Sequence, residues 1–253
     1  MTDPSIQATA ESAPTLSQGQ RVVSAFAAPS KLAADIQRGN KSWWFPFIIS
    51  LVLSFAFFGV VNSKVGMQQV VENQNHLSPK AEERLSQLTP EQRETNIKIQ
   101  VAVTEGFFVG APLVGLLMFL VFALIMWGTV NFVFGGKATF GKLFTLYNYA
   151  WLPQTIKVIL GIIVLYSGMA PESFNIRNYA PTNLAAFLDP IETNKMLYSL
   201  ASSVDFTMIW TLIVLSIGVA TIAGIKRNSA YIAVFGWWFV GALLGMAGAA
   251  FAG

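Results

Sequence analysis

The chain has 253 residues, of which 54% are hydrophobic and only 11% charged, and its mean hydropathy is +0.54. A soluble domain carries about 25% charged residues, so this chain has too few polar side chains to cover a water-facing surface. The absence of cysteine excludes disulfides and thiolate sites, and a formal net charge of +3 gives no indication of nucleic-acid binding. The composition predicts an all-α, polytopic membrane protein.

The chain begins with a polar segment, which we interpret as a disordered tail over residues 1–25. Its first twenty residues are rich in Pro, Ser, Thr, Ala and Gln. They lack the basic start and the apolar core of a secretory signal peptide. Residues 26–253 are then predicted to form the membrane domain.

A short helix is predicted over residues 28–39, because a proline stands near its start and a glycine at its end. Phe26, Leu32 and Ile36 share one apolar face, and Asp35 points away from that face with the neighbouring bases. We expect an interfacial helix that lies on the cytoplasmic leaflet.

Five apolar runs are long enough to cross a bilayer at 1.5 Å per helical residue. The third run contains Pro153, which is expected to kink it, and Lys157; without this run the chain would have four spans. The five runs cover residues 43–61, 106–134, 143–168, 206–225 and 230–251.

The distribution of charge predicts the orientation of these spans. With five spans, the N-terminal segment shares one side with the loops 135–142 and 226–229, which hold bases and no acid. On the other side, in residues 62–105 and 169–205, acids outnumber bases. The positive-inside rule therefore predicts a cytoplasmic N-terminus and a C-terminus outside.

The first outer loop, residues 62–105, is predicted to form a helical hairpin. Ser78-Pro79 can begin one helix, and Thr89 to Gln92 fits a capping box with proline at the first helical position. No Pro or Gly follows until Gly106. The second of these helices is therefore expected to continue directly into the second span.

Lys157 is the one basic residue inside a predicted span, and an ionisable group in hydrocarbon is a functional-site hypothesis by default. Its side chain can instead reach the outer surface or pair with Asp205 or Glu105 at the outer ends of neighbouring spans. Asp205 can equally cap the fourth span. A structural ion pair and a substrate or proton site therefore both remain open.

Several other residues are candidates for packing or for a ligand pathway. Asn131 is expected to form hydrogen bonds between helices. Small residues on one stripe of a helix let backbones approach closely, within the chain or in a homo-oligomer. The further pathway candidates are Tyr147, Asn148, Tyr149 and Pro153, and the predicted packing residues are Gly218, Gly241 and Gly245.

The sequence shows no nucleophile–histidine–acid set, no phosphate-binding loop and no paired carboxylates. Its single histidine, His76, cannot build a multi-histidine metal site. We therefore predict no catalytic residue, no metal and no cofactor, and no enzyme activity.

Three motifs resemble the Yip-domain family of multispanning membrane proteins, in its prokaryotic branch. They are Phe26-x-x-Pro-Ser-Lys-x-x-x-Asp-Ile followed by Ser42-Trp-Trp-x-Pro, the run Phe140-Gly-Lys-Leu-Phe-Thr-Leu-Tyr-Asn-Tyr-Ala-Trp-Leu-Pro153, and Asp205-Phe-x-x-x-Trp continuing to Ile217-Gly218. The resemblance implies a five-helix bundle with a cytoplasmic N-terminus, in a prokaryotic cytoplasmic (inner) membrane. Eukaryotic members of this family are similar to binding partners of Rab-type GTPases. This chain lacks the acidic Asp-Leu-Tyr-Gly-Pro motif of those eukaryotic members.

The leading hypothesis is a non-enzymatic membrane protein that binds a protein partner or organises the bilayer, with its basic side on anionic lipids. The alternative is a small transporter or channel that uses Lys157 and the kinked third span. A third possibility is an assembly subunit whose hairpin, residues 62–105, docks a partner outside the membrane.

Overall fold

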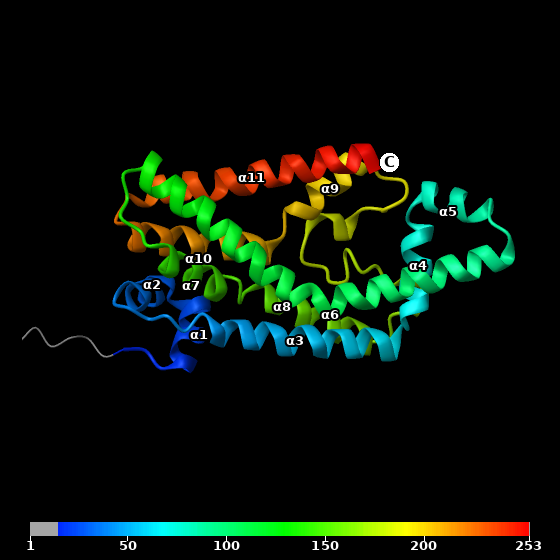
Figure 1. The fold of residues 1–253 in the computed structure, drawn as a ribbon, viewed down its shortest axis with the longest axis horizontal. Coiled ribbons are helices and arrows are strands. Elements are labelled where there is room, and N and C mark those ends of the chain that lie inside the picture. The colour runs from blue at the N-terminus through cyan, green and yellow to red at the C-terminus, as the bar shows by residue number, and fades with distance from the viewer. Residues whose placement is uncertain (1–14, 253) are drawn as a thin grey trace, which may run out of the picture.

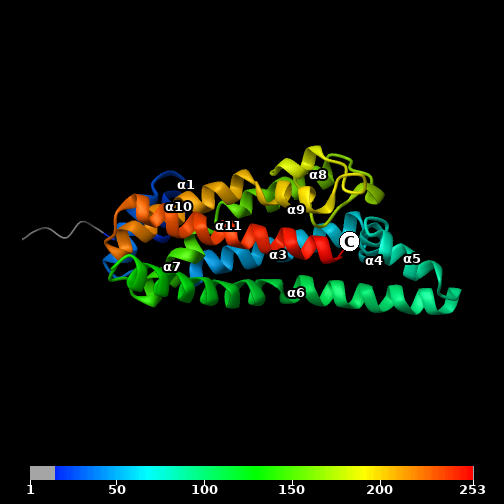
Figure 2. The ribbon, with the colours of Figure 1, turned by 90° about the horizontal axis from the view of Figure 1, so that it is seen from above.

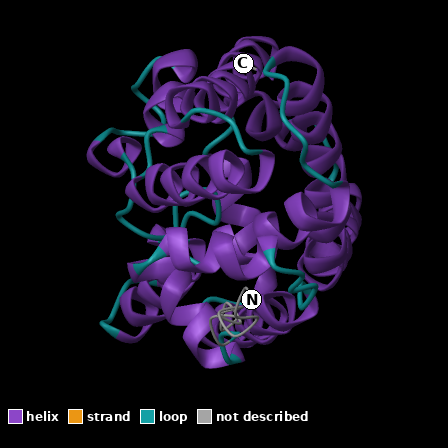
Figure 3. Ribbon diagram, turned by 90° about the vertical axis from the view of Figure 1, so that its left-hand side faces the viewer, coloured by secondary structure: helices purple, strands orange, loops and turns teal. Residues whose placement is uncertain are grey.

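The computed structural model describes residues 15–252, with side chains through residue 250, and this part of the chain is helical with no strand (Figure 1, Figure 3). It contains five helical segments that are long and apolar enough to cross a membrane. Each overlaps one of the predicted runs, so the predicted number of five spans is confirmed. The segments are Trp44–Lys64, Pro90–Val133, Phe140–Tyr166, Phe206–Ala223 and Arg227–Ala250.

Large apolar side chains are exposed along α3 (Trp44–Lys64), α6 (Pro90–Gly128) and α11 (Arg227–Ala252). On α6, Phe107, Leu113 and Leu117 are each more than 60% exposed. A water-facing surface rarely carries so extensive an apolar area, whereas lipid covers it without cost. These faces are the lipid-facing surface of an integral membrane protein.

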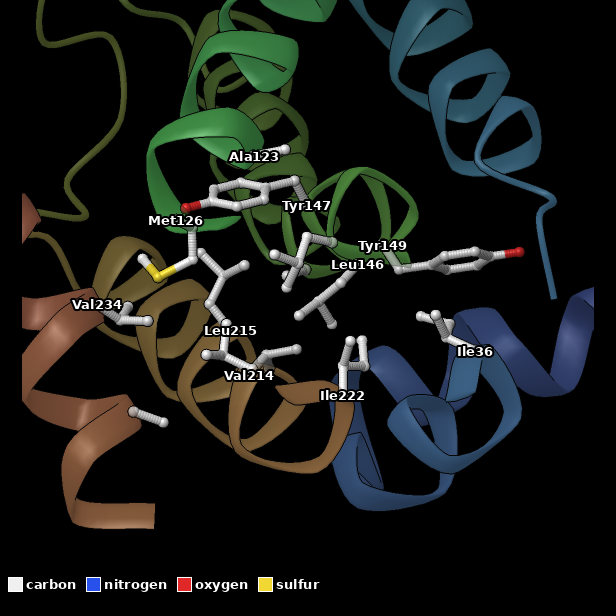
Figure 4. Close-up of a cluster of buried hydrophobic side chains, with 14 of the residues drawn as sticks. Ile36, Ala123, Met126, Leu146, Tyr147, Tyr149, Val214, Leu215, Ile222 and Val234 are labelled. Carbon is white, nitrogen blue, oxygen red and sulfur yellow. The ribbon is translucent and has the colours of Figure 1, made fainter. Parts of the chain in front are cut away.

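The most buried of the five spans is α10 (Phe206–Ala223), which contacts α2, α7 and α11. Val214, Leu215 and Ile222 of α10 meet Leu146 of α7 (Phe140–Ala150) and Ile36 of α2 (Pro29–Gln37) in one apolar cluster (Figure 4). The main core therefore lies toward the N-terminal end of the bundle, the end that carries α2.

Two helices, rather than a disordered tail and one interfacial helix, precede the first span. α1 (Gln18–Ala27) begins with a capping box made by Ser17 and Gln20, so the predicted tail is wrong from Gln18 onward, and residues 1–14 lie outside the described residues. α2 forms as predicted, but its apolar residues pack on α10 and α7 rather than on lipid. Asp35, predicted to point away from the apolar face, is 1% exposed.

The third span consists of two helices, α7 and α8 (Gln154–Tyr166), separated by a turn over residues 151–153. Pro153 lacks the N–H that an uninterrupted helix would need, and it stands at the N-cap of α8. The predicted kink is therefore a complete break. By contrast, α6 continues as one helix through Pro112 and ends in a π-helical turn, Thr129–Val133.

The predicted hairpin is present as α4 (Met67–His76) and α5 (Pro79–Ser86), followed by the first turns of α6. Thr89 and Gln92 form the predicted capping box at the start of α6. The hairpin extends past the last turns of α3 and α11 (Figure 1, Figure 2). We call this end of the molecule the hairpin end; the C-terminus lies toward it, opposite α1 and α2.

Of the predicted packing glycines, Gly218 packs closely against another span within the chain, and Gly241 and Gly245 do not. A Cβ on Gly218 would collide with the buried side chain of Leu146, so α7 and α10 approach closely there. A Cβ on Gly241 would meet nothing within 4 Å, and one on Gly245 would meet Ser199 Oγ at 3.8 Å. The stripe on α11 therefore does not bring two spans together within the chain.

We predict that Gly218→Val destabilises the protein by roughly 1–3 kcal/mol, because a larger side chain overpacks the contact with Leu146. The matched control is Gly241→Val, whose side chain enters open space and carries a similar helix-propensity change. Thermal unfolding of the detergent-purified variants tests this. Equal midpoints for the two variants would contradict the close packing of α7 on α10.

Candidate functional site

Lys157 and Asp205 form an ion pair inside the bundle. Lys157 Nζ lies 3.1 Å from Asp205 Oδ2, and their side chains are 18% and 6% exposed. The ammonium group also lies 5.6 Å from the centre of the Tyr179 ring, within the range of a cation–π contact. Of the two predicted partners, Asp205 and Glu105, the structure selects Asp205.

Both oxygens of the Asp205 carboxylate accept hydrogen bonds. Thr182 Oγ1 donates to Oδ2 at 2.6 Å, and the backbone N–H and hydroxyl of Thr207 donate to Oδ1 at 2.8 and 2.6 Å. The contact with the Thr207 N–H makes Asp205 the N-cap of α10, as predicted. Burial disfavours the charged carboxylate, but the bonds from Thr182 and Thr207 and the charge of Lys157 outweigh it. The pKa of Asp205 is therefore lowered.

The segment that supplies Thr182 and Tyr179 lies alongside the spans rather than beyond them. Tyr179 packs on Phe57 of α3, with ring centres 4.6 Å apart. Its ring also occupies the space that a side chain at position 161 of α8 would fill, because residue 161 is a glycine. In Figure 1 the segment lies beside the last turns of α3 and α11. Irregular backbone at such a depth is stable only where protein or a polar cavity surrounds it. Here Thr182 and Asp205 supply that polar environment.

We predict that Lys157→Met lowers the free energy of unfolding by about 3–5 kcal/mol, because it leaves the buried Asp205 carboxylate without its counter-charge. The double variant Lys157→Met/Asp205→Asn should recover part of the loss, since Asn can still cap α10. Thermal unfolding of both variants in detergent measures the coupling. A double variant that is as unstable as the single one would show that the two charges are not coupled.

A second buried carboxylate, Asp35, lies at the N-terminal end and was not predicted as a site. The backbone N–H of Leu16 donates to its Oδ1 at 3.0 Å, and Arg21 Nε donates to its Oδ2 at 2.7 Å. Arg38 lies 3.6 Å away. Burial opposes ionisation, but the bonds from Leu16 and Arg21 and the charges of both arginines outweigh it, so the pKa of Asp35 is lowered. This cluster joins α1 to α2.

Beside it, Tyr149 attaches α7 to the segment that precedes the first span. Its hydroxyl lies 2.8 Å from Ser42 Oγ and donates to Gln18 Oε1 at 3.0 Å. Ser42 also bonds to Asn40. The predicted site residue Tyr149 therefore has a structural contact at the N-terminal end.

We predict that Asp35 contributes stability that is lost in acid. Because its folded pKa lies below the ordinary value of 3.8, the unfolded state binds a proton first. The contribution is present above that value and disappears as the pH falls through the folded pKa. Thermal midpoints of wild type and Asp35→Asn should differ at pH 7 and converge toward pH 3. A difference that stays constant over this range would exclude the ionised cluster as its cause.

The remaining predicted site residues do not gather around Lys157. Asn131 bonds both backbone groups of Ala138 at 2.9 Å, so it closes the loop after α6 instead of joining two helices as predicted. Tyr147 faces the rings of Phe119 and Phe122 on α6. The side-chain N–H of Asn148 donates to the carbonyl of Phe144 within its own helix. These three side chains therefore contact a loop, α6 and their own helix, and they do not form one site with Lys157.

The N-terminal end also carries a surface that we call the basic face. It consists of the exposed bases of α2, of the linker after it and of the two short loops at this end. Between residues 15 and 252 the one acid at this end is Asp35, which is buried. The residues of the basic face are Lys31, Arg38, Lys41, Lys137, Lys226 and Arg227.

Sequence reasoning missed both the Asp35 cluster and the docking of α1. One signal was present: Ser17 and Gln20 stand three residues apart, directly before an apolar run, which is a capping-box pattern. Nothing in the local sequence indicates that Asp35 turns inward, because that depends on the position of Arg21 in a different helix.

The five apolar helices, their lipid-facing surfaces and the paired buried charges define a multi-pass integral membrane protein. The family model of the Yip1 domain matches residues 23–249, so the chain belongs to the Yip1 domain family. The resemblance seen in the sequence is thus confirmed at the level of the family. Comparisons with curated proteins and with solved structures gave no match.

Proposed function

We propose that this protein is a non-enzymatic membrane protein that organises the bilayer by binding anionic lipid headgroups with its basic face. The observation that supports this most directly is the charge of that surface. Six bases are exposed there, and the acid nearest to them in the described chain, Asp35, is buried and paired mainly with Arg21, which is not one of the six. An anionic leaflet attracts each nearby base by about 1 kcal/mol.

The surface next to the basic face favours contact with a membrane over binding of a ligand from water. Phe132 and Val133, in the π-helical turn at this end, are 78% and 72% exposed. Exposed apolar side chains beside bases are typical of surfaces that enter the interfacial region of a bilayer. Lys137 follows a few residues later, so charge and apolar contact occur on one short segment.

The backbone of one loop of the basic face is fixed by hydrogen bonds. Gly136 N–H donates to the carbonyl of Val130 at 2.8 Å, and Lys137 N–H donates to the carbonyl of Ala223 at 2.9 Å. These bonds attach the loop after α6 to the end of α10. A loop whose backbone is already fixed needs no backbone ordering on binding, which favours binding at Lys137.

The proposal includes a topology and a location. The basic face is assigned to the cytoplasm and the hairpin end to the opposite side, in agreement with the positive-inside rule. A prokaryotic inner membrane, rich in anionic lipid, is the proposed location. A protein partner with an acidic surface would use the same residues.

The transporter alternative has less support from the geometry. Each oxygen of Asp205 is already bonded, and Lys157 is held between Asp205 and Tyr179. A ligand at this pair would have to replace several short hydrogen bonds. The predicted pathway residues Asn131 and Tyr147 lie in other clusters.

The test is lipid binding by the detergent-purified protein, measured by native mass spectrometry with phosphatidylglycerol and phosphatidylcholine. We expect wild type to prefer the anionic lipid. The variant Lys137→Gln/Lys226→Gln/Arg227→Gln should lose roughly tenfold or more of that preference, since each base near the surface contributes about 1 kcal/mol.

The matched control removes three exposed bases of the hairpin end, as Lys80→Gln/Arg84→Gln/Lys98→Gln. An equal effect of both triple variants would show that net charge, not the basic face, governs the preference. Photocrosslinking from position 137 in native membranes identifies the occupant. A stoichiometric protein adduct at that position would show that the basic face binds a protein partner instead of lipid.

A further inference from the structure

A cavity of about 480 Å³ opens at the hairpin end, where α4, the segment after α8, α9 (Lys195–Ser203) and the last turns of α11 meet. Its volume is within the range of small-ligand sites. In Figure 1, α9 lies next to the last turns of α11, and α4 lies beyond the C-terminus. None of the residues that were predicted as a ligand pathway lines it, whereas Gly245, predicted as a packing residue, does.

The cavity is cationic. Arg177 and Lys195 line it, and no carboxylate is among its lining residues. Neither base forms an ion pair within the described chain, in contrast to Lys157 and Arg21. The smaller cavity inside the hairpin, about 140 Å³, differs because Glu72 and Glu82 line it together with bases. Two unneutralised cations in one concave site favour an anionic ligand.

Three other lining side chains can donate hydrogen bonds. Tyr198 and Ser199 present hydroxyl groups, and Gln74 presents an amide, whereas the Ser202 hydroxyl already donates to the backbone carbonyl of Tyr198 at 2.8 Å. Asn178 donates to the Tyr198 oxygen at 3.4 Å, which leaves the tyrosine O–H free to donate. A guanidinium, an ammonium and hydroxyl groups are a donor set that recognises phosphate oxygens.

The floor of the cavity is made by small residues of α11. Gly245 and Gly248 line it within the span Arg227–Ala250, close to its end. A Cβ on Gly248 would meet nothing within 4 Å, so the missing side chains leave space. The end of a span lies near the headgroup level of a bilayer. The cavity is therefore placed where the phosphates of one leaflet lie.

We propose that this cavity binds a phosphate-bearing anion, with Arg177 and Lys195 as its charged ligands and the hydroxyls of α9 completing the site. The ligand is either the headgroup of a phospholipid in the leaflet at the hairpin end or a free organic phosphate. The site is separate from the basic face, which lies at the opposite end of the molecule.

The walls of the site are connected before any ligand binds. Gln74 Nε2 of α4 lies 3.5 Å from Asn175 Oδ1, which also accepts from the backbone N–H of Arg177 at 2.9 Å. Asn178 then joins this segment to Tyr198 of α9. The segment that carries Arg177 is thereby held between α4 and α9.

The experiment measures two ligands on delipidated protein in a neutral detergent. Glycerol 1-phosphate is titrated by calorimetry, and phosphatidylglycerol by native mass spectrometry. Arg177→Gln/Lys195→Gln should weaken binding at least tenfold. Gly245→Leu, which keeps both charges and fills the floor, should weaken it similarly. The charge-matched control is Lys80→Gln/Arg84→Gln on α5.

Each outcome decides one point. Binding of both ligands, lost in both cavity variants, supports a site for free phosphates, and binding of the lipid alone supports a headgroup site. Unchanged affinity in Arg177→Gln/Lys195→Gln, or equal weakening in the control, overturns the proposal. Thermal midpoints show whether each variant is folded. If the double variant does not fold, Gly245→Leu still tests the proposal.

The inference and the proposed function fail separately. If Lys137→Gln/Lys226→Gln/Arg227→Gln loses anionic lipid while the cavity variants keep both ligands, the cavity proposal is wrong and the basic face stands. If the cavity variants lose both ligands while Lys137→Gln/Lys226→Gln/Arg227→Gln keeps its preference for anionic lipid, the proposal for the basic face is wrong and the cavity proposal stands.

Discussion

The Asp205 carboxylate is the point on which the hairpin half of this protein depends. It caps α10, accepts the Thr182 hydroxyl from the preceding irregular segment and neutralises Lys157 of α8. A bilayer cannot hydrogen-bond a loose backbone, so an irregular segment beside the spans needs protein partners for its polar groups. Asp205 supplies them, and two backbone bonds next to it, between Phe206 and Thr182 and between Leu184 and Val204, complete the junction. A lysine inside a span is thereby the counter-charge of a structural carboxylate.

The N-terminal half uses the same principle with a different acid. Asp35 is buried against Arg21 and Arg38, and this allows an amphipathic helix to turn an acid inward and place its apolar face on α10. A buried acid without these partners would cost several kcal/mol. Because Asp35 lies inside the bundle, the exposed charged side chains at this end are all bases within residues 15–252. The docking of α1 and α2 therefore removes the one described acid from the surface at this end.

Much of the fold was readable from the sequence, because span length and the position of Pro, Gly and capping residues are local signals. The five spans, the capping box at Thr89, the disturbance of the third span at Pro153 and the cap at Asp205 are of this kind, although the break at Pro153 is more complete than the predicted kink. The errors concern contacts between segments. Asn131 bonds to Ala138 of its own loop instead of to a second helix. Asp35 faces inward, and Gly241 packs on no span within the described chain. The last two depend on where a distant helix lies, which no local pattern encodes. The cavity at Arg177 and Lys195 depends on four elements and has no signature in any of them.

That cavity has a geometric origin in the lengths of the last two spans. α10 has 18 residues and α11 has 26, so at 1.5 Å per residue α11 is ~12 Å longer. Beyond Asp205 the remainder of α11 is covered by α9, a short helix on a loop rather than a continuation of α10. Glycines on α11 face this helix without a close contact, since Gly245 meets only Ser199 at ordinary distance. A short span beside a long one, with a separate short helix beside the remainder of the long one, leaves an opening that polar side chains then line.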